Sequence, residues 1–139
     1  MKKMALLISM FLLVGEVALA KNYSGLIRDK TKLAPITISS GQEMTSKPYK
    51  LKAGKYYQIV LKSDGSREAP IVGASFFRNI WVNQISINGI EVRPLGIDSF
   101  EFDDEGSLKL TFVPIKPGTY TLGYASARSD RERAIFIVE

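Results

Sequence analysis

The sequence predicts an all-β fold, a sandwich of short strands with one short helix. Apolar and polar residues alternate with period two along much of the chain, which is typical of half-buried strands. Pairs of residues that contain Gly, and that favour tight turns, separate the alternating segments. Only one segment shows helical spacing. A series of short strands separated in this way indicates a β-sandwich.

The strands are assigned from this alternation. Tyr57, Ile59 and Leu61 alternate with polar residues, and the same pattern recurs at residues 108–112 and 119–124. The expected strands cover residues 26–28, 35–39, 47–51, 57–62, 84–88, 99–103, 108–112, 119–124 and 134–139. The expected turns are Ala53-Gly54, Asp64-Gly65, Asn88-Gly89, Glu105-Gly106 and Pro117-Gly118.

The one helical segment spans residues 74–82. Phe77, Ile80 and Trp81 stand at positions i, i+3 and i+4, which favours a short helix across one end or face of the sandwich. Aromatic residues at this spacing usually pack in a core, so we expect Phe76, Phe77 and Trp81 to be buried. The alternative is that they form an aromatic recognition surface. Arg78 and Asn79 should point outward.

The first twenty residues have the pattern of a cleavable signal peptide. Lys2 and Lys3 precede an apolar run over residues 4–14, and Ala18-Leu19-Ala20 matches a cleavage site. The apolar run is shorter than the roughly twenty residues that span a bilayer. We therefore expect residues 1–20 to be removed, residues 21–139 to form one domain in the periplasm, and no stable membrane insertion afterwards.

Charge and composition exclude several kinds of function. The formal net charge is only +5, and the basic residues are scattered, so the sequence indicates no nucleic-acid partner. The chain has no His and no Cys. A Ser-His triad, a zinc hydrolase site and thiol catalysis are therefore excluded. No S-x-x-K or G-x-S-x-G motif is present either, so the sequence indicates no enzyme.

Two segments carry a resemblance to a known family. Lys52-Ala53-Gly54-Lys55-Tyr56-Tyr57 leads into a strand, and residues 112–120 read Phe-Val-Pro-Ile-Lys-Pro-Gly-Thr-Tyr before the closing hairpin. Residues 51–139 resemble a cupredoxin, and residues 76–93 are similar to the Phe-Phe-Arg-x-Ile-Trp region of bacterial periplasmic cupredoxin-like domains. The resemblance implies a Greek-key β-sandwich.

The copper ligands of that family have no counterpart in this sequence. Where the resemblance would place the Cys ligand the chain has Tyr124, and the loop that follows, residues 125–133, contains no soft donor. A type 1 copper centre needs two imidazoles and a thiolate. We therefore expect no copper, and no other cofactor.

The loop before the last strand contains three arginines, Arg128, Arg131 and Arg133. Their guanidinium groups suit carboxylate or phosphate partners. The alternative is that Asp130 and Glu132 neutralise them in a solvated turn. The three arginines of this loop, together with Arg78, are the candidate binding residues.

A second group of charged residues is acidic and precedes Gly106. Glu101, Asp103, Asp104 and Glu105 could ligate a hard cation such as Ca²⁺ through oxygen. Solvated acids beside a turn glycine are the simpler interpretation, because these residues do not have the spacing of an EF-hand. The sequence thus favours a non-enzymatic binding or structural module that docks on another periplasmic protein. The alternative is a metal-handling protein with oxygen ligands.

Overall fold

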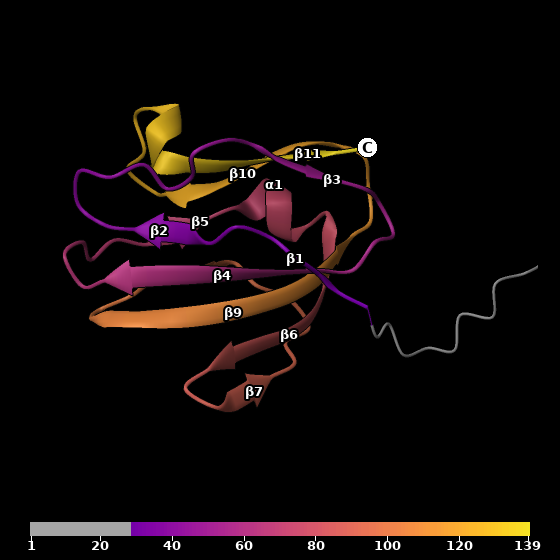
Figure 1. Cartoon of the computed structure of the whole chain (residues 1–139), viewed down its shortest axis with the longest axis horizontal. Helices are drawn as coiled ribbons and strands as arrows, with labels where there is room; N and C mark the ends of the chain where they lie inside the picture. The colour runs from indigo at the N-terminus through magenta and orange to yellow at the C-terminus, as the bar shows by residue number, and fades with distance from the viewer. Residues whose placement is uncertain (1–28) are drawn as a thin grey trace, which may run out of the picture.

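The computed structural model describes residues 29–139, which form two facing β-sheets. The first sheet contains β1 (Thr31–Lys32), β2 (Ile36–Ile38), β4 (Tyr57–Asp64), β9 (Glu105–Pro114), β6 (Ile80–Ile87) and β7 (Ile90–Val92). The second contains β3 (Tyr49–Leu51), β11 (Arg133–Val138), β10 (Gly118–Tyr124), β5 (Ile71–Val72) and β8 (Ser99–Phe100). One short helix, α1 (Ala74–Phe77), and one 3₁₀ turn, η1 (Asp130–Glu132), complete the fold (Figure 1).

One edge of the sandwich is closed by strands from the beginning of the described chain. β1 and β2 pair in succession with β4, and β3 pairs with β11, all in parallel register. The Tyr49 hydroxyl of β3 donates to the carbonyl oxygens of Ala34 and Pro35, at 3.0 and 3.3 Å, and so joins the two sheets along this edge. Since β1 and β3 end their sheets here, β7 and β8 lie at the opposite edge.

The core lies between the sheets and is centred on aromatic rings. Phe76 of α1 stacks on Phe136 of β11, with ring centroids 4.2 Å apart, and meets the ring of Phe112 of β9 edge-on at 5.4 Å. All three side chains are fully buried. The helix therefore fills the space between the sheets, as Figure 1 shows, and links them through one side chain.

The helix is shorter than the sequence predicts. It ends at Phe77, and the Asn79 side chain donates to the Ser75 carbonyl oxygen at 2.7 Å. Ile80 starts β6, where its pairing with Pro114 of β9 replaces further helical turns. Phe76 and Phe77 are buried as predicted, but Trp81 is 51% exposed because it lies on the outer face of β6. The predicted helix over residues 74–82 and the predicted burial of Trp81 are therefore wrong.

The predicted fold class is confirmed, since the structure is a β-sandwich with one short helix. The strands predicted at 57–62, 108–112, 119–124 and 134–139 correspond to β4, β9, β10 and β11. Of the strand predicted at 99–103, only Ser99–Phe100 pairs. The predicted strand at 26–28 and signal peptide at 1–20 lie outside the described residues.

Candidate functional site

The candidate site is the end of the sandwich where β10 leads through loop 125–132 into β11. Gly123 makes this connection possible, because its missing side chain lets the loop fold back onto β10. A Cβ at position 123 would lie 2.5 Å from the Glu132 carbonyl oxygen and 3.0 Å from Arg133 Cα. The loop is therefore held close against the end of the strand.

Tyr124, the last residue of β10, fills this end of the core. It is 3% exposed, and its hydroxyl oxygen accepts a hydrogen bond from the Ser39 backbone N–H at 3.2 Å. The guanidinium group of Arg67 covers the ring, with its carbon 3.6 Å from the ring centroid. Burial raises the pKa of the Tyr124 hydroxyl above its ordinary value.

Arg67 also secures the loop through Glu132. Arg67 Nη2 donates to Glu132 Oε1 at 2.9 Å, and the Arg128 backbone N–H donates to Glu132 Oε2 at 2.8 Å. These two bonds, with the Arg128 bond contributing more, hold the pKa of Glu132 below its ordinary value. The loop is thus closed by one carboxylate that accepts a hydrogen bond on each of its oxygens.

A second hydrogen-bonded carboxylate stands beside this group. Asp64, at the end of β4, accepts from the Ser39 hydroxyl at 2.7 Å and from the Ser66 backbone N–H and hydroxyl at 2.9 and 2.6 Å. The Ser39 bond contributes most, and the pKa of Asp64 falls to about 2. Ser39 therefore connects Asp64 to Tyr124.

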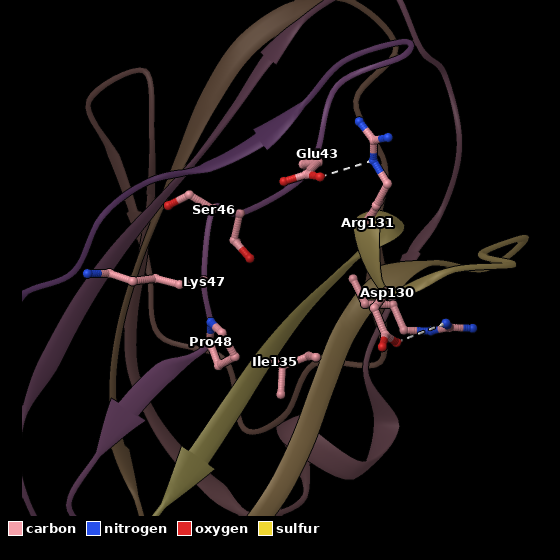
Figure 2. A pocket seen from close by; sticks show the side chains of 9 residues that line it. Glu43, Ser46, Lys47, Pro48, Asp130, Arg131 and Ile135 are labelled. Atoms are coloured by element: carbon pink, nitrogen blue, oxygen red, sulfur yellow. Dashed lines mark ion pairs between the residues drawn. The ribbon is translucent and has the colours of Figure 1, made fainter.

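A groove of about 200 Å³ opens between this loop and the β2–β3 connection (Figure 2). Its cationic residues are Lys47, Arg131 and Arg133, and its acids are Glu43 and Asp130. Arg131 Nε lies 3.1 Å from Glu43 Oε1, and Arg133 Nη1 lies 3.8 Å from Asp130 Oδ1, the two pairs drawn in Figure 2. Arg133 is also fixed by donating from Nη2 to the Ala127 carbonyl oxygen at 2.7 Å. We call this the arginine groove.

The predicted binding residues are only partly brought together. Arg131 and Arg133 line the arginine groove, and Arg128 lies in the same loop with its side chain exposed. Arg78 lies at the opposite end of the sandwich, because it follows α1 next to Asn79, whose carbonyl oxygen accepts from Ile115 in the β9–β10 turn at 2.9 Å. The structure therefore does not bring Arg78 together with the three loop arginines.

The alternative metal ligands do not form a metal site. Glu101, Asp103, Asp104 and Glu105 border a hollow of about 410 Å³ whose apolar lining includes Phe100. Within residues 29–139, no three Asp or Glu side chains gather in a way that could hold an ion. The structure thus gives no support to the alternative prediction of a metal site with oxygen ligands.

The residues at Tyr124 do not fit copper either. The position holds a buried phenol beneath a guanidinium group, and this cation would repel a second positive ion. The chain has neither His nor Cys to provide nitrogen or sulfur ligands. No step of copper chemistry can therefore be assigned to these residues.

Sequence reasoning missed the residues that hold the loop. Ser39, Asp64 and Arg67 come from segments far from the loop, and Arg67 and Glu132 are 65 positions apart. Asp64 had a local signal, because it precedes a turn glycine and bonds to Ser66 in the manner of an Asx turn. Arg67 had none, since its two contacts form only in the folded sandwich.

Comparison with solved structures supports a cupredoxin-like fold. The chain is similar to a multi-copper oxidase from Pseudomonas thermotolerans, with a TM-score of 0.57 and 14% identity over 79% of this chain and 30% of that protein. It is also similar to copper nitrite reductase from Nitrosomonas europaea, with a TM-score of 0.51 and 14% identity over 69% of this chain and 33% of that one. For the blue copper oxidase from Nitrosomonas europaea the TM-score is 0.51 and the identity 11%, over 66% and 30%.

These similarities establish the fold alone, and the chain spans a third or less of the length of each of these proteins. No protein-family model matches the sequence. No curated protein matches it either. Over residues 29–139, none of the helices has the length and apolar character needed to span a membrane.

Proposed function

We propose that this chain is a non-enzymatic binding module of the periplasm, built on a cupredoxin-like sandwich without type 1 copper, that docks on another protein through the arginine groove. The observation that carries the proposal is the buried Tyr124 beneath Arg67. It occupies the end of the sandwich where the family resemblance places the copper ligands, so this end offers a surface in place of a metal.

The arginine groove has the chemistry to recognise an acidic segment. Lys47, Arg131 and Arg133 outnumber the two acids that line it. Arg133 is already oriented by its bond to Ala127, which reduces the entropy lost when a carboxylate binds. An arginine guanidinium can then bind a carboxylate with two parallel hydrogen bonds.

The exposed ion pair at the rim makes this recognition possible. Arg131 and Glu43 are 67% and 48% exposed, so their mutual attraction contributes at most about 1 kcal/mol. A carboxylate from a partner can therefore replace Glu43 at small cost. Arg128, exposed in the same loop, can provide a further contact.

Binding is tested with protein purified after expression of the full chain and with a glutamate decapeptide as the probe. We expect amide NMR signals of residues 45–47 and 126–133 to shift on titration, and inorganic phosphate to cause smaller shifts at the same signals. Arg131→Ala should weaken peptide binding about tenfold, the effect of losing a contact of about 1.4 kcal/mol. Arg78→Ala, an exposed arginine at the opposite end, should leave it unchanged.

Two results would contradict the proposal. One is that the peptide shifts no signal in these segments, or that it binds Arg131→Ala and Arg78→Ala with the same affinity. The other is an intense visible absorption band of copper bound by the protein when Cu²⁺ is added, because that would show a centre where we assign none.

A further inference from the structure

A second groove runs along the edge of the sandwich formed by β1, β2 and β3. Its volume is about 250 Å³, and its charged residues are Lys32, Lys47 and Lys50, with no Asp or Glu in the lining. All three lysines are exposed, and within residues 29–139 none of them forms an ion pair. We call this the lysine groove, and its cations have no counter-charge of their own.

The lining of the lysine groove is not purely polar. Leu33, Ala34, Pro35 and Pro48 provide apolar surface between the lysines. A surface that combines an apolar centre with a charged rim has the composition of a protein interface rather than of a small-ion site. Tyr49 keeps the groove in shape, because its hydroxyl bonds to the Ala34 and Pro35 carbonyl oxygens across it.

A turn that leads from β8, at the opposite edge, to the start of β9 has the reverse charge. Residues 101–105, the acidic turn, carry four carboxylates and no base. They border the hollow of about 410 Å³, whose apolar lining includes Ile87, Phe100, Phe102 and Leu108. Ile90 of the neighbouring strand β7 is 65% exposed, so apolar surface continues along this edge.

The two charged edges cannot meet within one molecule. β1 and β3 end the two sheets on one side, and β7 and β8 end them on the other. Figure 1 shows β3 and β7 on opposite sides of the molecule. The body of the sandwich holds the lysine groove and the acidic turn apart, so the two surfaces can contact each other only when they belong to different copies.

We propose that the lysine groove of one copy receives the acidic turn of a second copy, so that the protein associates head to tail. The cationic rim then faces four carboxylates, and apolar surface on each side is removed from water. A contact between two different surfaces repeats along an assembly and leads to a ring or a filament rather than a two-fold dimer. This inference does not rest on the arginine groove, since Lys32 and Lys50 line only the lysine groove.

Sedimentation velocity of protein expressed from the full chain tests association. At an ionic strength of about 0.01 M, where charges act over about 30 Å, we expect the mean mass to rise with protein concentration. At about 1 M, where they act over about 3 Å, we expect monomer. Protein that stays monomeric at low salt across the concentration range would overturn the proposal.

Charge reversal identifies the surfaces. Lys32→Glu with Lys50→Glu gives a protein that is acidic at both surfaces, and Glu101→Lys with Asp103→Lys and Asp104→Lys gives one that is basic at both. Each variant alone should remain monomeric, and an equimolar mixture should associate again, because every contact then joins opposite charges. A defect of folding cannot produce this recovery. No recovery in the mixture would contradict head-to-tail contact.

The matched control is Lys109→Glu with Lys116→Glu. This variant has the same change in net charge at two exposed lysines that line neither the lysine groove nor the acidic hollow. It should associate like the wild type, and a control that stays monomeric would show that net charge alone is responsible. Arg131→Ala should also associate normally, so failure of the proposed function and failure of self-association are distinguishable.

Discussion

The guanidinium carbon of Arg67 lies 3.6 Å from the centroid of the Tyr124 ring. The same guanidinium group forms an ion pair with Glu132, and both side chains are 24% exposed. One arginine therefore covers the end of the core and holds loop 125–132 to the body of the sandwich. The arginine groove depends on this arrangement, because the loop forms one of its walls.

Replacing Arg67 should weaken this end of the molecule. Arg67→Ala removes a cation–π contact and a partly buried hydrogen bond to a carboxylate, so we expect the free energy of unfolding to fall by about 1–2 kcal/mol. Urea unfolding followed by circular dichroism measures it. Arg78→Ala should change stability by less than about 0.5 kcal/mol, as expected of an exposed residue. Equal effects of the two variants would contradict the role of Arg67.

Asp64 should make stability depend on acidity. Its pKa is lowered from 3.8 to about 2 in the folded protein, so the folded state prefers the ionised carboxylate. The stabilisation is complete above the ordinary pKa and is lost as the pH falls through about 2. The free energy of unfolding, measured with urea at pH values between about 2 and 3.8, should depend less on pH for Asp64→Asn than for the wild type. Asp98→Asn, an exposed acid of the β7–β8 connection, should retain the wild-type dependence.

Phe76 should be the most sensitive residue of the helical segment. Phe76→Ala leaves a cavity between Phe112 and Phe136, and the expected loss is about 3–5 kcal/mol. Trp81→Ala removes a larger side chain from the outer face of β6 and should cost much less, since half of that residue is already in water. Thermal unfolding distinguishes the two. A Trp81 variant as unstable as the Phe76 variant would place both in the core.

Gly123 should tolerate no side chain. Gly123→Ala directs a methyl group against the Glu132 carbonyl oxygen, so loop 125–132 must move and stability should fall by about 1–3 kcal/mol. Gly96→Ala provides the control, because a Cβ there has no atom within 4 Å. Amide NMR signals of the loop should shift in the first variant and not in the second. Unchanged loop signals in Gly123→Ala would argue against the close approach.

The long strands were predictable because each places apolar residues on the face toward the core and mostly polar residues on the other face. In β4, Ile59 and Leu61 are fully buried while Lys62 is exposed, and this difference is what produces the alternation. The short strands β1, β5 and β7 have two or three residues each, too few to show a period. Their pairing is decided by neighbours distant in sequence.

The candidate site was predictable only in part. Arg131 and Arg133 were identified because they are close together in one loop. Glu43, which pairs with Arg131, and Lys47, which lines the same groove, come from a segment more than eighty residues earlier. The helix was overestimated because Ile80 and Trp81 match helical spacing. Hydrogen bonding to β9 decided their conformation instead, and local spacing carries no information about it.

The position of β11 in the second sheet has a consequence for biosynthesis. Residues 133–138 lie between β10 and β3, and they contribute Phe136 to the aromatic centre. A nascent chain that has emerged from the ribosome only as far as residue 132 therefore lacks the strand that joins its earlier and later halves. With contacts this distant in sequence, folding should be slow and should not be complete until residues 133–138 have left the ribosome.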